Sequence, residues 1–246
     1  MNSAKDDISY SDHPNCQTCN IRTHGVLLTA SAETMLKINK GKHFGKYPRG
    51  SHIFRVGEEA KGFYFIRSGL VRNYKTNGGR EQTFNVRGPS DWIGFRDTLI
   101  GDVYYHSSIC LEDVEACFIS KDIAEVLLRE DPNFQTEVFR QMAKEWRESE
   151  TQVVSLGTKQ VHSKLAELLI TLKTAAGETN EIELKMTREV LASIIGTTTE
   201  TLVRALSDFK NREIVHVEKN RVIFQDMKSL YSLSEMDHDR MLKNNS

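Results

Sequence analysis

Long apolar runs are missing from this chain of 246 residues. No stretch approaches the roughly 18–20 consecutive apolar residues that a membrane-spanning helix needs. Residues 1–15 are polar and lack the apolar segment that a secretory signal carries. We therefore expect a cytoplasmic protein without a membrane partner.

Recognisable catalytic motifs are also missing. The sequence contains no P-loop, no G-x-S-x-G or H-E-x-x-H pattern, and no G-x-G-x-x-G that opens a helix after a strand. We therefore do not expect an enzyme.

A strong excess of one charge is absent as well, because 33 Lys and Arg stand against 34 Asp and Glu, for a net charge of −1. The chain as a whole therefore gives no sign of nucleic-acid binding. Local charge matters more than the sum when one small domain does the binding. A small DNA-binding domain remains compatible with this balance.

Cysteine is scarce, with residues only at Cys16, Cys19, Cys110 and Cys117. Cytosolic cysteines are kept reduced, so we expect no disulfide framework. Cys16 and Cys19 have the C-x-x-C spacing used for metals and for redox chemistry. Residues 1–25, which contain this pair, are polar without apolar periodicity, and we expect a flexible arm there.

Short apolar segments follow between residues 26 and 130. Residues 29–43 indicate an amphipathic helix. From there to about residue 120, segments such as Phe63–Ile66, Leu70–Tyr74 and Gln82–Val86 alternate with glycines. Short aromatic and β-branched segments with regular turn signals predict an antiparallel sandwich or barrel. No strand–helix alternation supports a doubly wound parallel sheet.

The period becomes helical after Pro132, and we expect one long helix within residues 131–158. Apolar or small residues recur there at spacings of three or four, which is the pattern of a coiled-coil seam: Val138, Met142, Trp146, Ser149, Val153 and Leu156. Such a seam either pairs with its own copy or packs on its own β-domain. We favour self-pairing into a homodimer.

Residues 159–235 predict a winged helix-turn-helix, with a polar tail at 236–246. Thr187 can cap a first helix, Gly196 ends it, and Thr197, Thr198 and Thr199 offer caps for a second. Two short strands, Ile214–Val217 and Val222–Phe224, then form the wing. The fold class is therefore α+β.

In the second helix, Glu200, Val203 and Arg204 share one face. Arg pairs with the O6 and N7 of guanine, Glu can accept from cytosine N4, and a branched side chain can touch a thymine methyl. The three threonines can hold a phosphate, and we add Thr187 to the DNA-contacting candidates. The alternative is a solvated face with an internal Glu200–Arg204 pair. We favour DNA reading.

The order of these motifs resembles the CRP/FNR superfamily, and its FNR branch in particular, over nearly the whole chain. The residues that carry the resemblance are Ile66-Arg67-Ser68-Gly69, Gly94-Phe95, Met186-Thr187-Arg188, and Gly196 followed by Glu200-Thr201 and Arg204. The resemblance implies an N-terminal β-roll of cupin or jelly-roll type. It also implies a homodimer on a palindromic promoter site, with RNA polymerase as a partner. Val203 stands where the FNR branch has Ser, so the outermost thymine preference should change.

The family's cyclic nucleotide cassette has Gly-Glu and, further on, Arg-Ser. This chain has Gly94-Phe95-Arg96-Asp97 and His106-Ser107-Ser108 in those places. A buried phosphate needs a cation and backbone donors. We therefore do not expect cyclic AMP to bind.

The FNR branch also suggests an iron–sulfur cluster, which normally takes four thiolates. Cys16, Cys19 and Cys117 match three ligands of that pattern, whereas the remaining one falls at Gly25, with His24 adjacent. A cluster held by these residues, a thiol redox sensor and a relic motif all stay open. So do a regulator without an effector and a partner-binding regulator with a degenerate DNA-binding domain.

Overall fold

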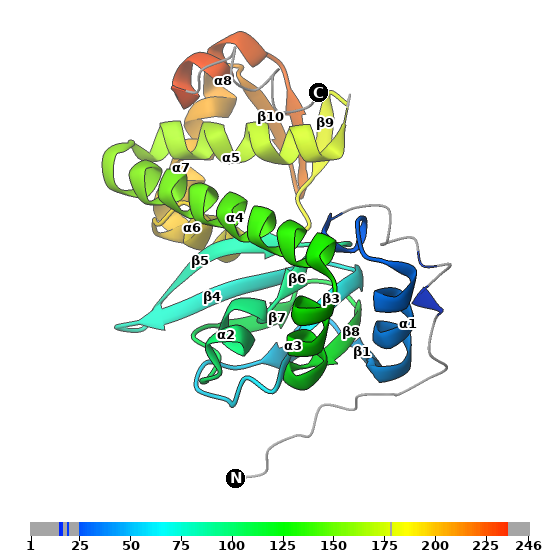
Figure 1. The fold of residues 1–246 in the computed structure, drawn as a ribbon. Coiled ribbons are helices and arrows are strands. Elements are labelled where there is room, and N and C mark those ends of the chain that lie inside the picture. The colour runs from blue at the N-terminus through cyan, green and yellow to red at the C-terminus, as the bar shows by residue number, and fades with distance from the viewer. Residues whose placement is uncertain (1–14, 17–18, 20–24, 178, 236–246) are drawn as a thin grey trace. The chain divides into compact units, whose positions relative to one another are not determined.

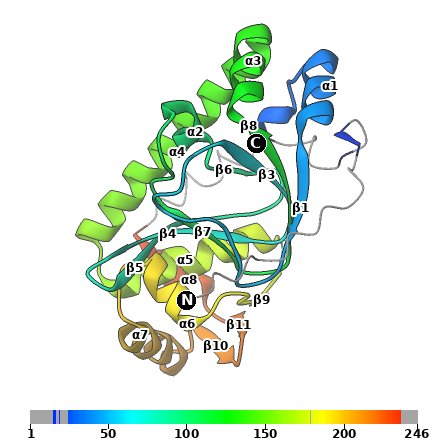
Figure 2. The ribbon, with the colours of Figure 1, turned by 90° about the horizontal axis from the view of Figure 1, so that it is seen from below.

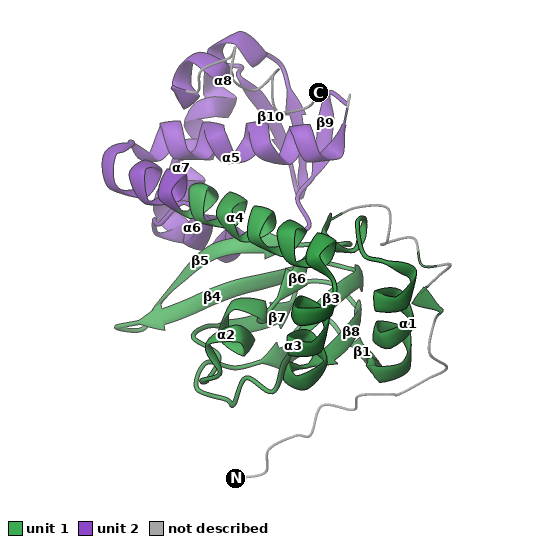
Figure 3. Ribbon diagram, in the orientation of Figure 1, with its two compact units in different colours: residues 1–149 green, residues 150–246 purple. Residues whose placement is uncertain are grey.

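A computed structural model describes residues 15–16, 19, 25–177 and 179–235. The polar tail and most of the expected arm therefore lie outside the described residues. The chain divides within a long helix into two compact units, residues 1–149 and 150–246 (Figure 3). None of the described helices has the length and apolar character needed to cross a membrane.

Unit 1 is built on two four-stranded antiparallel sheets (Figures 1 and 2). The first has, in spatial order, β1 (His43–Tyr47), β8 (Val114–Ser120), β3 (Gly62–Ser68) and β6 (Trp92–Ile93). The second has β2 (His52–Phe54), β7 (Ser107–Cys110), β4 (Val71–Asn77) and β5 (Arg80–Arg87). Strands β3 and β5 contain two of the three segments predicted from sequence, and β4 contains the other except for Leu70. The expected antiparallel β-roll is confirmed.

Residues from both sheets meet in one buried cluster, which shows that the sheets face each other. Phe54 and Val71 come from the second sheet, and Ile66 and Ala116 come from the first. The turn from β3 to β4 requires glycine at Gly69, where φ is +81° and an added Cβ would lie 2.3 Å from the Asp113 carbonyl oxygen. An L side chain at that position would be both strained and sterically blocked.

Helices cover the outer face of the first sheet. They are the 3₁₀ turn η3 (Gly25–Leu27), α1 (Ala32–Gly41), α2 (Phe95–Ile100), α3 (Lys121–Glu130) and α4 (Pro132–Thr158). Ser31 and Ser120 cap α1 and α3 by accepting from a backbone N–H in the first turn. A second cluster packs Ile38 of α1 and Leu127 of α3 against Phe63 of β3.

The long helix α4 begins at Pro132, a favoured first position because proline has no N–H to leave unpaired. Its first turns belong to the core of unit 1, since Phe134 and Val138 are buried there. The dimer seam predicted from the sequence is therefore wrong at Val138. Val138 is 1% exposed and packs on its own β-domain, whereas the neighbouring Phe139 is 62% exposed.

Unit 2 carries the helices α5 (Val161–Ala176), α6 (Arg188–Ile194), α7 (Thr199–Asn211) and α8 (Met227–Ser234). A three-stranded antiparallel sheet has the order β10 (Val215–Glu218), β11 (Arg221–Phe224) and β9 (Glu181–Glu183). The predicted wing hairpin is β10–β11. The strand β9 was not expected from the sequence and adds a third member to the wing sheet.

Candidate DNA-binding and effector sites

Helices α6 and α7 form the helix-turn-helix that the sequence predicts. Thr187 caps α6 by accepting from the Val190 N–H at 3.4 Å, and Thr198 caps α7 by accepting from the Thr201 N–H at 3.2 Å. Between them Gly196 takes a φ of +65°, which glycine adopts without strain. Both threonines therefore have structural roles at helix starts, and Thr198 is the cap among the three candidates.

The two faces of α7 differ sharply in exposure. Leu202, Leu206 and Phe209 are buried in unit 2. Arg204 and Glu200 have side chains 77% and 73% exposed, and they form an ion pair one helical turn apart. Val203 is 45% exposed. The structure therefore brings all three predicted base-reading residues to one solvent-facing surface, and it also contains the internal pair that the alternative interpretation invoked.

The wing turn is fixed by a residue that the sequence analysis did not assign. Arg188, the first residue of α6, donates from Nη2 to the Lys219 carbonyl oxygen at 2.9 Å. Lys219 sits in the β10–β11 turn with φ +49°. This hydrogen bond sets the wing beside the start of the helix-turn-helix.

The exposed side of α4 carries a regular heptad. Large exposed side chains stand seven residues apart at Phe139, Trp146 and Val153, with exposures of 62%, 71% and 69%. Met142, Ser149 and Leu156 fall between them, so the spacing alternates three and four. The sequence analysis missed Phe139. Val138 lies four residues before Met142 and Phe139 three, and both spacings fit a helical seam.

The cysteines do not form a metal site among the described residues. His24 lies outside that part of the chain. Where the structure is described, no group of three or more His, Cys, Asp or Glu is placed to hold a metal ion. The buried Lys42 ammonium donates to Cys16 Sγ at 2.9 Å. Cys16 and Cys117 are 7% and 6% exposed, so Cys16 packs into the core rather than on a flexible arm.

Burial raises the pKa of the Cys117 thiol to about 11, and the nearby Lys42 ammonium offsets this only in part. In the metal-free chain Cys117 is therefore a protonated thiol at neutral pH, and this does not bear on metal binding, because a cation deprotonates the thiol that ligates it. The described residues do not fit a preassembled iron–sulfur site, because no three ligands of the kind that hold a metal come together among them.

A cavity of about 550 Å³ opens in unit 1 between the β-roll and α4. Its apolar wall is mainly aromatic, formed by Phe84, Trp92, Phe95, Phe139 and Trp146. Gly94 also lines it, with φ +79° and an added Cβ only 2.8 Å from the Tyr104 ring. The Gly94-Phe95 motif noted in the sequence thus shapes the cavity wall.

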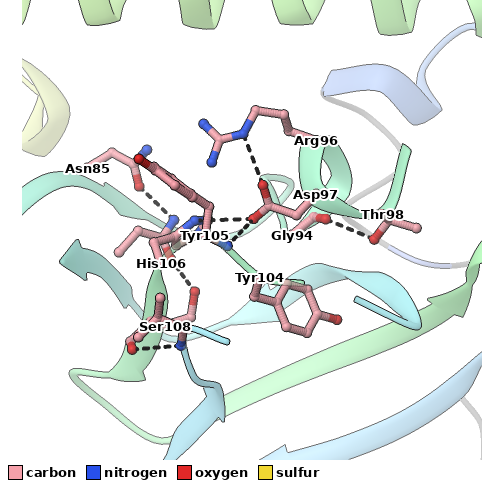
Figure 4. A network of polar contacts seen from close by, with 12 residues as sticks. Asn85, Gly94, Arg96, Asp97, Thr98, Tyr104, Tyr105, His106 and Ser108 are labelled. Carbon is pink, nitrogen blue, oxygen red and sulfur yellow. Dashed lines mark hydrogen bonds and ion pairs between the residues drawn. The ribbon is translucent and has the colours of Figure 1, made fainter. Parts of the chain in front are cut away.

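Three polar side chains that line this cavity, Arg96, Asp97 and His106, lie close together (Figure 4). Asp97 accepts from Arg96 Nε and from the Tyr105 backbone N–H, each at 3.1 Å. His106 Nδ1 lies 3.4 Å from Asp97 Oδ2 but makes no hydrogen bond to it. Burial lowers the pKa of His106 to about 4, although Asp97 acts in the opposite direction. His106 is therefore neutral at pH 7.

Comparison with known proteins gives two domain matches. A model of the cyclic nucleotide-binding domain matches residues 44–131, and a model of the Crp-like helix-turn-helix domain matches residues 163–233. Together they cover well over half of the chain. The chain belongs to the CRP/FNR superfamily of transcription regulators.

Similar members of the superfamily include a fumarate and nitrate reduction regulator and a CRP-like regulator. The chain is 27% identical over 225 residues to the fumarate and nitrate reduction regulatory protein of Vibrio cholerae, covering 89% of this chain and 90% of that protein. It is 26% identical over 189 residues to a CRP-like cAMP-activated global transcriptional regulator of Mycobacterium tuberculosis, covering 75% and 84%. The FixK2 structure from Bradyrhizobium japonicum has the same fold, with a TM-score of 0.73 at 22% identity, covering 80% and 98%.

The cavity of this CRP/FNR regulator does not fit a cyclic nucleotide. A buried phosphate needs a cation that is not already neutralised. Arg96 faces Asp97, and Arg87 lies 3.6 Å from Glu145 and 3.9 Å from Glu148. The neutral His106 stands where the family's cassette has an arginine. No mechanistic step through cyclic AMP follows from these residues.

Proposed function

We propose that this regulator acts as a homodimer on a palindromic promoter site, with one α7 helix in each major groove and RNA polymerase as the downstream partner. The observation that supports it best is the outward-facing set Glu200, Val203 and Arg204 on a capped helix of a helix-turn-helix. Exposed side chains of these types read base edges.

The Glu200–Arg204 pair does not argue against this role. An ion pair between two side chains that are more than 70% exposed contributes little to stability, typically 0–1 kcal/mol. DNA can therefore separate the pair at small cost. In the free protein the pair holds both groups on the face that would enter the groove.

The exposed heptad of α4 supports the dimer. Phe139, Trp146 and Val153 present large apolar groups that a lone chain leaves in water. Pairing two such helices buries both seams, because knobs at these positions fit into holes on a partner helix. Two-fold symmetry then places the two half-sites about one helical turn of DNA apart.

Fluorescence anisotropy with labelled duplexes tests the proposal. The probes are a TTGAT-type palindrome, the half-site expected from the family resemblance, and the same palindrome with about half a helical turn of DNA inserted between its halves. We expect the first to bind at least about 10³-fold more tightly than unrelated DNA, and the insertion to remove most of that preference. Equal affinity for all three duplexes would refute sequence reading by a symmetric dimer.

A further inference from the structure

The charges that line the unit 1 cavity cancel one another. Arg87 Nη2 lies 3.6 Å from Glu145 Oε1, and Arg96 Nε donates to Asp97 Oδ1 at 3.1 Å. All four side chains line the cavity. An anionic ligand would have to draw a guanidinium away from a carboxylate that stays beside it, and like charges repel strongly where water is scarce. The lining therefore favours an uncharged ligand.

Aromatic rings that a ligand can reach line the same cavity. Phe139 and Trp146 are 62% and 71% exposed, and Phe84 is half-buried. The buried Trp92 and Phe95, whose rings stack at a centroid distance of 4.0 Å, also contribute to the wall. Such rings favour a ligand with an aromatic ring of its own, which can stack on them or meet them edge-on.

Asn85 supplies a hydrogen-bond donor that a ligand can reach. Ser108 Oγ donates to Asn73 Oδ1, and Asn73 Nδ2 donates to Asn85 Oδ1 at 2.7 Å. Within the described part of the chain, these bonds leave Asn85 Nδ2 without an acceptor. Asn85 is half-buried and lines the cavity, and its Nδ2 keeps solvent-accessible surface. Water can therefore bind Nδ2 in the free protein, and a ligand acceptor can replace that water.

We propose that this cavity binds an uncharged aromatic molecule with a carbonyl oxygen, which accepts a hydrogen bond from Asn85 Nδ2. The paired charges disfavour a phosphate or carboxylate, the rings hold the aromatic body, and Asn85 selects the carbonyl group. Phe139, Met142 and Trp146 line the cavity and also belong to the α4 heptad. A ligand would therefore touch the surface through which the proposed dimer pairs. Its role as an effector rests on the proposed function, but its binding does not.

Isothermal titration calorimetry on the full chain tests this with three probes of similar size. Acetophenone carries the carbonyl, ethylbenzene has a methylene group in its place, and benzoate adds a negative charge. We expect acetophenone to bind. We expect benzoate to bind at least about tenfold more weakly than acetophenone, because both arginines that line the cavity already face carboxylates.

The variant Asn85→Asp keeps an acceptor for Asn73 and removes the donor. It should lower the ratio of acetophenone affinity to ethylbenzene affinity by about fivefold, the value of one hydrogen bond. The ratio cancels any general effect of the substitution on the cavity. Asn77→Asp makes the same change at the end of β4, where the side chain is exposed, and should keep the native ratio.

A second measurement does not depend on the variants. Both tryptophans of the chain, Trp92 and Trp146, line the cavity. Ethylbenzene should therefore change their emission when they are excited beyond its absorption band. The concentration at half-saturation should match the one from calorimetry, which places the bound molecule beside these rings.

Failure of acetophenone to bind, benzoate binding as tight as acetophenone binding, or a native affinity ratio in a folded Asn85→Asp variant would overturn the inference. So would tryptophan emission that ethylbenzene leaves unchanged. These measurements contain no DNA, so their failure is distinct from a failure of sequence-specific DNA binding.

Discussion

The indole N–H of Trp92 donates to Glu145 Oε1 over 2.8 Å, which ties β6, the edge strand of the first sheet, to the middle of α4. Glu145 also lies 3.6 Å from Arg87 of β5. All three residues line the cavity. A shift of the Trp92 ring would therefore disturb Glu145, a carboxylate on α4 that residues of both β5 and β6 contact.

Glu145→Ala should destabilise unit 1 by about 1–2 kcal/mol, because the variant leaves the Trp92 N–H without its acceptor and Arg87 with only the more distant Glu148. The free energy of unfolding from urea titration measures this. Glu150→Ala, an exposed carboxylate on the same helix, is the matched control and should stay within about 0.5 kcal/mol of the native chain. Equal effects of the two variants would show that the Trp92 hydrogen bond has no energetic role.

Arg204→Ala should lower affinity for the palindromic site by about 10–100-fold while affinity for unrelated DNA changes little, because a bidentate guanine contact contributes about 1–3 kcal/mol of discrimination. Anisotropy titrations at fixed salt measure both affinities. Arg212→Ala is the control, since Arg212 lies at the C-terminal end of α7, about two helical turns from Arg204, and pairs with Asp208. A variant at Arg204 that binds the palindrome as tightly as the native chain would refute direct readout by this residue.

Neighbouring residues of α4 should respond oppositely to substitution. Phe139→Glu should dissociate the dimer without unfolding the chain, because Phe139 is 62% exposed. Val138→Ala should keep the dimer but lower the free energy of unfolding by about 2 kcal/mol, because Val138 is in the core. Light scattering after gel filtration and urea titration separate the two effects. A dimer that survives Phe139→Glu would place the interface elsewhere.

The sequence predicts the elements of this fold well where an apolar periodicity runs over many residues or where a side chain of the capping type marks a helix start. The expected helix within 131–158 appears as α4, and the cap at Thr187 appears with its hydrogen bond. Both rest on local physics, since helical periodicity and capping need no knowledge of distant residues. The exposed set on α7 follows from the same periodicity.

Features that depend on tertiary packing were not predictable. Phe139 and Val138 are adjacent and both apolar, and only the contact of Val138 with the β-roll core decides which one stays exposed. The three-residue strand β9 is too short to show alternation. Lys42 is 26 residues from Cys16 in sequence, so no local spacing indicates their contact. The charge-balanced cavity likewise combines residues from β5, α2 and α4.

The chain purified without oxygen should hold far less than one iron per chain, because the described cysteines form no metal site and Lys42 already binds Cys16. Iron and sulfide analysis with a visible absorption spectrum measures this. DNA affinity should then be the same before and after exposure to air. A brown protein that bleaches in air would contradict this and would direct the search for further ligands to His24.

Stability should fall as pH drops from about 6.5 toward 4, and His106 should account for part of the loss. Burial lowers its pKa in the folded chain to about 4, whereas an unfolded histidine has a pKa of about 6.5. Between these values the unfolded chain binds a proton that the folded chain does not, so acid favours unfolding. Asp97 raises the His106 pKa, and Arg96 and Lys75 lower it. The loss due to His106 alone is about 2 kcal/mol at pH 5.

Urea titrations at pH 7 and pH 5, on the native chain and on His106→Leu, isolate this contribution. Titrating groups that lie far from His106 contribute equally in both chains and cancel in the comparison. The variant should lose about 2 kcal/mol less than the native chain between the two pH values. It should also be at least as stable as the native chain at pH 7, because leucine removes a buried polar group whose ring nitrogens make no hydrogen bond. If both chains lose the same free energy, His106 is either solvated or hydrogen-bonded in the folded protein.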